Sequence, residues 1–270
     1  EIATFEDRGL ISGTALDEHG RSQAGMGIAL ADFDGNRLPD LFVTNFYQEA
    51  NTLYLNSGDL QFVDSSRESG LAVPSMNLLG FGTQAVDLDL DGDMDLFVAN
   101  GHIQRDPTGV QPWTMPAQVF ENLGGGRFRD VTDSVGPDIA IPRLGRGVAV
   151  SDLNRDGLPD IVMVAQHGPA TLLENRCHSR GRSVTLRLTG TKSHRDARGS
   201  RLTVQSGDRR NVQWVNMNGG YLASNSPVVF AAVDSDTRQI YVDVLWPNGE
   251  TTTHEINVAG QSEEWRLFES

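Results

Sequence analysis

Three segments of the chain align without gaps, and this repetition constrains the fold more than any other feature. Residues 31–45, 86–100 and 151–165 read ADFDGNRLPDLFVTN, VDLDLDGDMDLFVAN and SDLNRDGLPDIVMVA. The first two are followed by a second pattern with matching offsets, which contains Asn56, Phe62 and Asp64, then Asn122, Phe128 and Asp130. The third copy keeps Asn175 and then diverges. Such self-similarity indicates that one supersecondary unit is repeated.

Each repeat predicts a set of short strands. The runs LFVTNF, LFVANG and IVMVAQ are apolar and rich in β-branched residues, as in strands buried on both faces. No segment has a 3.6-residue apolar period, and about four strands per repeat is typical of a propeller blade. We therefore expect an all-β chain in which residues 1–177 form a partial β-propeller of about three blades.

The start of the chain resembles part of a repeat. TFEDRGL, residues 4–10, is similar to QFVDSSRESGL and RFRDVTDSVG, so we expect it to be the last strand of an earlier blade. Propellers close with roughly four to eight blades. We expect the chain to be a fragment, with the remaining blades supplied by missing chain or by a partner.

The last third of the chain lacks the repeat but still predicts strands. Residues 178–270 contain the runs SVTLRLTG, SRLTVQSG, NVQWVNMN, PVVFAAV, IYVDVLWPNG and TTTHEINV, separated by turn signals. They predict a second domain, a small β-sandwich or barrel. Residues 184–189 could equally be the outer strand of the third blade.

The Asp-rich loop of each repeat predicts a metal site. Its spacing is Asp-x-Asp/Asn-x-Asp/Asn-x-x-x-Asp, and the residue at position 7 can add a backbone carbonyl. The predicted ligands are Asp32, Asp34, Asn36, Leu38 and Asp40; Asp87, Asp89, Asp91, Asp93 and Asp95; and Asp152, Asn154, Asp156, Leu158 and Asp160.

Calcium fits these loops best, because it takes six to eight oxygen ligands in flexible geometry. An EF-hand would need Glu at position 12, where Val43, Val98 and Met163 stand. Magnesium resists all-protein cages, and zinc prefers His or Cys. Asx turns without metal are the alternative. We expect the second, most acidic loop to bind tightest and Arg37 to weaken the first.

Charge and motifs exclude several functions. The formal net charge is −14, with no basic face for nucleic-acid phosphates. No apolar run is long enough to span a membrane. Cys177 is the single cysteine, so no internal disulfide can form. We find no nucleophile elbow, phosphate-binding glycine loop or zinc-protease motif.

At these loops the sequence resembles the FG-GAP/VCBS repeat family, whose blades form integrin-like propellers with calcium between strands. The tail resembles the ASPIC/UnbV domain of the cartilage acidic protein family, on SHRDARGSRLTV, NGGYLASNSP and LWPNGE. The resemblance implies about seven blades, more than this chain supplies, and a secreted or envelope protein. It implies no settled activity.

Three other sets of residues are weaker candidates. Tyr47, His102 and His167 each follow the last Asp of a loop by seven residues, and they could share a ligand or transition metal or simply end strands. Trp113, in a long loop, could be a ligand platform or pack over its own blade. Arg195, Asp196 and Arg198 could bind an anion, but a solvated surface is preferred.

These observations predict a calcium-binding, extracytoplasmic β-propeller module for adhesion, with a protein or glycan ligand. The alternative is an enzyme, such as a lyase, cyclase or hydrolase, that uses the propeller face with calcium as Lewis acid or structural ion. Converging His102 and His167 in a rim pocket would favour the enzyme.

Overall fold

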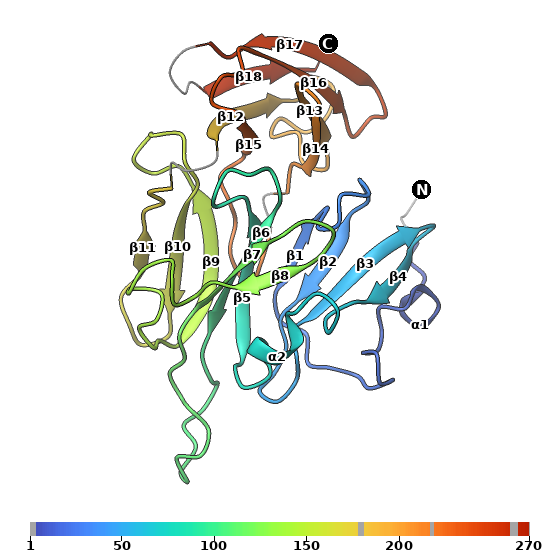
Figure 1. Ribbon diagram of the computed structural model, residues 1–270. Helices are drawn as coiled ribbons and strands as arrows, with labels where there is room; N and C mark the ends of the chain where they lie inside the picture. The colour runs from blue at the N-terminus through green and yellow to red at the C-terminus, as the bar shows by residue number, and fades with distance from the viewer. Residues whose placement is uncertain (1–3, 178–180, 217–218, 260–263, 270) are drawn as a thin grey trace.

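The computed structural model describes residues 4–177, 181–216, 219–259 and 264–269, and nearly all of its regular structure is β-strand (Figure 1). Within these described ranges, the strands form five separate sheets. The all-β, propeller-like class is therefore confirmed, whereas the expected count of about three blades and one small sandwich or barrel is corrected to five sheets. The number of sheets differs from the expectation because the tail has no Asp-rich repeat. Its sequence therefore does not indicate that its strands are divided between two sheets. The expected boundary at residue 178 and Asn218 of the tail motif lie outside the described residues.

Three sheets come from the three repeats, and we call them the first, second and third repeat sheets. Their strands pair antiparallel in chain order. The first contains β1 (Ile28–Ala31), β2 (Asp40–Val43), β3 (Thr52–Gly58) and β4 (Gln61–Asp64); the second β5 (Gly80–Val86), β6 (Asp95–Asn100), β7 (Gln118–Asn122) and β8 (Phe128–Asp130); the third β9 (Gly145–Ser151), β10 (Asp160–Ala165) and β11 (Thr171–Leu173). Two one-turn helices, α1 (Gly9–Ser12) and α2 (Ala72–Ser75), precede the first and second sheets.

The other two sheets, the tail sheets, lie above the Asp-rich ends of the repeat sheets (Figure 1). One has the order β15-β12-β18 and the other β14-β13-β16-β17. Their bounds are β12 (Arg182–Thr189), β13 (Arg201–Ser206), β14 (Arg209–Trp214), β15 (Val229–Val233), β16 (Gln239–Leu245), β17 (Thr251–Asn257) and β18 (Glu264–Phe268). One apolar core joins both sheets, with Trp246 1% exposed at its centre. Residues 184–189 thus belong to the tail rather than to the third repeat.

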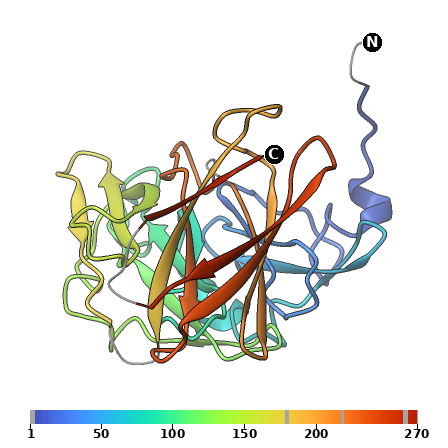
Figure 2. The ribbon, with the colours of Figure 1, turned by 90° about the horizontal axis from the view of Figure 1, so that it is seen from above.

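Neighbouring repeat sheets pack through apolar side chains that alternate along their strands. All six residues of β6 are buried, as expected for a strand covered on both faces. The first and second sheets share a core in which the rings of Phe33 and Phe128 meet edge to face at 5.7 Å. The second and third share a core around Phe97 and Ile161. Figure 2, viewed from above, shows the tail sheets lying across this row.

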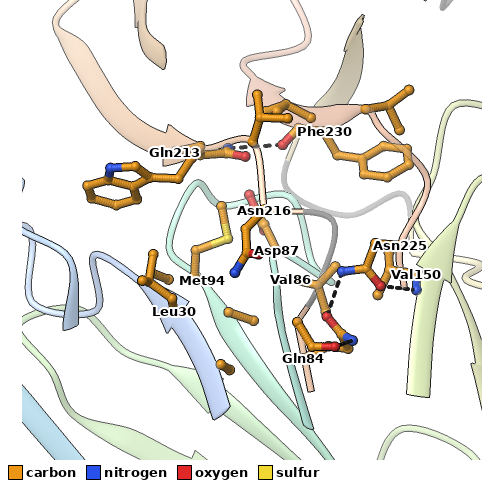
Figure 3. A pocket seen from close by; sticks show the side chains of 18 of the residues that line it. Leu30, Gln84, Val86, Asp87, Met94, Val150, Gln213, Asn216, Asn225 and Phe230 are labelled. Carbon is orange, nitrogen blue, oxygen red and sulfur yellow. Dashed lines mark hydrogen bonds between the residues drawn. The ribbon is translucent and has the colours of Figure 1, made fainter. Parts of the chain in front are cut away.

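One tail segment leaves the tail sheets and lies along the inner strands of the repeats. Gly220 bridges to Ile28 of β1, and the N–H of Ser226 donates to Val150 O of β9 (3.2 Å). The same segment also contacts β5: the Gln84 side chain donates to Gly219 O and accepts from Asn225 Nδ2 (Figure 3). A cavity of about 100 Å³ remains between this segment and the inner strands. Residues of the motif NGGYLASNSP therefore connect the tail to the inner strands of the repeat sheets through hydrogen bonds.

Among the described residues, no helix is long and apolar enough to cross a membrane.

Candidate metal-binding loops

The three Asp-rich loops occupy equivalent places in the three repeat sheets. They join β1 to β2, β5 to β6 and β9 to β10, at the end that faces the tail sheets (Figure 1). The Asp at position 9 is the first residue of β2, β6 and β10, namely Asp40, Asp95 and Asp160. The expected strand–loop–strand geometry is therefore present in all three repeats.

Carboxylates converge in the first two loops. Asp32, Asp34 and Asp40 each place an oxygen within 4.8 Å of the others. The carboxylates of the second loop, Asp87, Asp89 and Asp95, do the same. Within the described part of the chain, these are the two places where three or more Asp, Glu, His or Cys side chains lie close enough together to hold a metal ion. The third loop has Asn154 at the corresponding position, so an amide oxygen replaces one carboxylate there.

The backbone of each loop turns twice through the left-handed region. At position 4 the φ angles are 82° for Gly35, 62° for Leu90 and 64° for Arg155; at position 6 they are 70° for Arg37, 96° for Gly92 and 88° for Gly157. The sequence indicated position 6 through its glycines, but not position 4. This turn aims the position-6 N–H at the first Asp, over 2.9 to 3.0 Å in all three loops. Arg37 adopts the same conformation as the glycines, and its side chain is exposed.

The Asp at position 9 fixes the loop to its own sheet. One oxygen of Asp95 accepts the N–H of Leu88 (2.9 Å), and the other accepts the N–H of Asn122 (2.8 Å). Asp40 and Asp160 make the matching pairs with Phe33 and Asn56, and with Leu153 and Asn175. Both carboxyl oxygens of the position-9 Asp therefore accept backbone N–H groups, so hydrogen bonds preform each loop on its own sheet.

Two of these asparagines also join successive loops, a role that sequence reasoning missed. Asn122 Nδ2 donates to Met94 O of its own loop and to Phe33 O of the first loop, both at 3.1 Å. Asn175 Nδ2 donates to Leu88 O of the second loop (3.0 Å). The sequence shows that these asparagines recur at the same position of each repeat. It does not predict their hydrogen bonds to the preceding repeat, because those bonds depend on how the sheets pack.

The second loop is the most enclosed of the three. Leu90 is 2% exposed and packs with Leu158 of the third loop and Ala232 of β15. Asn211 of β14 donates to Gly92 O (3.0 Å). Burial raises the pKa of Asp93, and the nearby Arg209 guanidinium partly opposes this. The tail sheets therefore contact the loop that carries the most acidic residues.

Burial and mutual repulsion hold several of these carboxyl groups away from their ionised form. Loss of solvation raises the pKa of Asp40 to about 6, of Asp87 to about 7 and of Asp95 to about 8. Neighbouring Asp charges contribute to these raised pKa values, as expected for like charges at one site, whereas backbone N–H donors partly oppose the rise. A divalent cation would offset both effects and favour the ionised form.

We predict that the metal-free protein loses stability as the pH rises. The pKa values of Asp40, Asp87 and Asp95 are raised above their unfolded values, so the folded state binds more protons between about pH 4 and 8. This stabilisation is complete below the unfolded pKa and disappears through the folded pKa values. Urea unfolding in EDTA should therefore give a lower free energy of unfolding at pH 8.5 than at pH 5.5. The opposite slope would contradict it.

The remaining candidates do not assemble into one accessible site. Tyr47 and His102 are in ring contact at 6.1 Å, but His102 is 3% exposed. His167 is exposed and lies beside Gln166. Trp113 is half-buried under the guanidinium of Arg105, which lies 5.4 Å from the ring centroid.

In the tail, Asp196 and Arg198 form a surface ion pair (3.5 Å). Such an exposed pair fits the preferred solvated-surface interpretation.

Comparison with known proteins agrees with the class that the loops and sheets define. Residues 32–98 match the family model for the FG-GAP-like repeat, and residues 190–266 match that for ASPIC and UnbV. Two segments of the chain are therefore similar to an FG-GAP-like repeat and to an ASPIC/UnbV domain.

Its relatives include cartilage acidic protein 1 from three vertebrates. The human protein is 24% identical over 94% of this chain, the mouse protein 28% over 59%, and the Xenopus tropicalis protein 46% over 21%. The chain spans 37%, 24% and 9% of their lengths, respectively.

Proposed function

We propose that this chain is a calcium-stabilised, extracytoplasmic, adhesion-like module that binds a protein or glycan ligand. The observation that carries the calcium assignment is the convergence of three carboxylates in each of two equivalent loops. Crowded acidic oxygens suit a hard cation with many oxygen ligands. The match to FG-GAP-like repeats and an ASPIC/UnbV domain supports the adhesion-like role and the extracytoplasmic location.

The ligand sets follow the repeat. Positions 1, 3, 5 and 9 would supply side-chain oxygens, and the carbonyl oxygens of Leu38, Asp93 and Leu158 would supply position 7. Calcium would hold each turn at the end of its sheet and so order the edge that faces the tail. In the first and third loops, Asn36 and Asn154 each replace one carboxylate, so we expect weaker binding there than in the second loop.

Calorimetric titration with calcium tests this proposal. We expect heat from at least two sites, with the second loop filling first because all four of its side-chain ligands are aspartates. Asp91→Asn should weaken the tighter site, since it converts this loop to the side-chain ligand set of the first, whereas magnesium should bind more weakly to both. The absence of binding heat at millimolar calcium would contradict the proposal.

A further inference from the structure

The third repeat sheet differs from the other two at its outer edge. In the first and second sheets a fourth strand, β4 or β8, pairs with the third strand. In the described part of the chain, β11 pairs with β10 alone. Its outer edge thus offers unpaired backbone groups, which are a template for another strand.

A large cleft lies beside this edge, between the second and third repeat sheets. Its volume is about 810 Å³, within the range of ligand pockets, and its lining includes Leu88, Val131, Val135, Leu173 and Glu174. The equivalent space between the first and second sheets is filled by β8, whose Phe128 packs on Phe33. Leu88 is the counterpart of Phe33 in the repeat. The cleft therefore lies where the fourth strand of the third sheet would pack.

Three equivalent glycines lie where the fourth strand of each repeat sheet would pass closest to the backbone. Gly13, Gly70 and Gly136 each follow the Asp of a Phe-x-Asp pattern by six residues, and their φ angles are 86°, 84° and 128°. A Cβ on Gly13 would lie 2.4 Å from Phe62 O of β4, and one on Gly70 would lie 2.8 Å from Phe128 O of β8. A Cβ on Gly136 would meet no atom within 4 Å. The third glycine thus also has a positive φ, but no described strand lies against it.

The charges at this edge indicate what the missing strand carries. In the second sheet, Glu121 of β7 pairs with Arg129 of β8, and the flanking pairs are Asn122 with Phe128 and Phe120 with Asp130. Glu174, Asn175 and Leu173 are the counterparts of Glu121, Asn122 and Phe120. A strand paired with β11 in the same register would place an aromatic residue opposite Asn175, a basic one opposite Glu174 and Asp opposite Leu173.

Residues 4–7 of a second copy of this chain would fit the edge of β11 less well than a segment with a basic central residue. They carry the Phe-x-Asp pattern, and Phe5 is 97% exposed. In the same register, however, Glu6 would lie opposite Glu174, and like charges directly opposite each other destabilise a strand pair.

We propose that the cleft binds an extended segment of a partner polypeptide with the pattern Phe–Arg/Lys–Asp, which adds to β11 as an antiparallel fourth strand. Backbone hydrogen bonds would give affinity, and the aromatic residue would fill the space against Leu88. The carboxylate of Glu174 now pairs with the exposed Arg176 (2.7 Å), and it would exchange this partner for the basic residue of the bound segment. The proposal does not depend on calcium, and its test is done in saturating calcium.

A peptide copied from residues 125–133, GGRFRDVTD, is a direct probe. We expect the labelled peptide to bind the full chain in fluorescence anisotropy with a micromolar Kd. Peptides carrying Phe128→Ser or Arg129→Glu should bind at least tenfold more weakly. Absence of binding by the parent peptide, or equal binding of all three, would overturn the proposal.

Two protein variants locate the site. Gly136→Val should abolish peptide binding, because its side chain would occupy the space kept for the strand carbonyl. Glu174→Lys lies on the exposed edge and should leave folding intact while reversing the preference toward the Arg129→Glu peptide. Unchanged preference in Glu174→Lys would place the peptide elsewhere and overturn the assignment. Concentration-dependent dimers in sedimentation velocity that Phe5→Ser abolishes would identify a second copy as the occupant and also overturn it.

Discussion

Calcium will raise the melting temperature of this protein by about 5–10 °C for each site that it fills at a hundred times its Kd. Binding to the folded state alone at that ratio stabilises by about 2.7 kcal/mol, and in a chain of this size 1 kcal/mol shifts the melting temperature by roughly 2–4 °C. Differential scanning fluorimetry in EDTA and in millimolar calcium measures the shift. Asp89→Asn, which removes one of three converging carboxylates, should lower the calcium-dependent part of the shift.

Asp133→Asn is the matched control for this experiment. It removes the same charge from an exposed position outside the loops. We expect the control to keep the full calcium shift and Asp89→Asn to raise the calcium Kd roughly tenfold or more, because affinity follows the charge of the ligand set. Equal shifts in the two variants would show that the second loop holds no stabilising ion.

Removing the Asn122 side chain will destabilise the protein by roughly 3 kcal/mol. This residue is 1% exposed, and its amide donates to Phe33 O and Met94 O while its oxygen accepts the N–H of Gly124. Asn122→Ala leaves Met94 O and the N–H of Gly124 without this partner, and each such group costs about 1–3 kcal/mol. Phe33 O loses one of its two donors and keeps the N–H of Gly126 (3.0 Å). Urea unfolding in calcium measures the loss.

Asn56→Ala is the control that distinguishes the stability due to hydrogen bonds within a repeat from the stability due to the hydrogen bond between repeats. Asn56 is the counterpart of Asn122 in the first sheet, and its amide donates to Pro39 O of its own loop. Asn56 Oδ1 also accepts the N–H of Gly58, so Asn56→Ala removes two side-chain hydrogen bonds and Asn122→Ala removes three. We therefore expect Asn56→Ala to cost about two-thirds as much as Asn122→Ala, since it breaks no bond to another loop. Equal costs would contradict a stabilising role for the bond between Asn122 and Phe33.

Much of the repeat fold could be predicted because its signals are local. The runs after each Asp-rich loop are β-branched and apolar, and they form β2, β6 and β10 with the closing Asp as first residue. Periodicity also identified the tail as β-structure. It could not show that β12 pairs in parallel with β18 some eighty residues later, because such pairing is set by tertiary packing.

Part of the candidate site could be predicted from the spacing of its residues. Of the fifteen predicted ligands, the structure brings together the carboxylates of Asp32, Asp34 and Asp40, and likewise those of Asp87, Asp89 and Asp95. The other ligands remain predictions. The left-handed conformation of Leu90 and the contact of Asn211 with Gly92 were not predictable. Leucine has no preference for that conformation, and the contact joins residues 119 positions apart.

The tail segment that lies along the inner strands, residues 219–226, makes contacts with residues far away in the sequence, and such contacts affect how fast the chain folds. Gln84 meets Gly219 and Asn225 across 135 and 141 positions of sequence, so neither end of this contact can form until both regions are ordered. Contacts between distant residues slow folding, because the entropy of loop closure is lost before the contacts compensate for it. During synthesis, Gln84 can therefore gain these contacts only after residues 219–225 have been made, well after the repeat strands themselves.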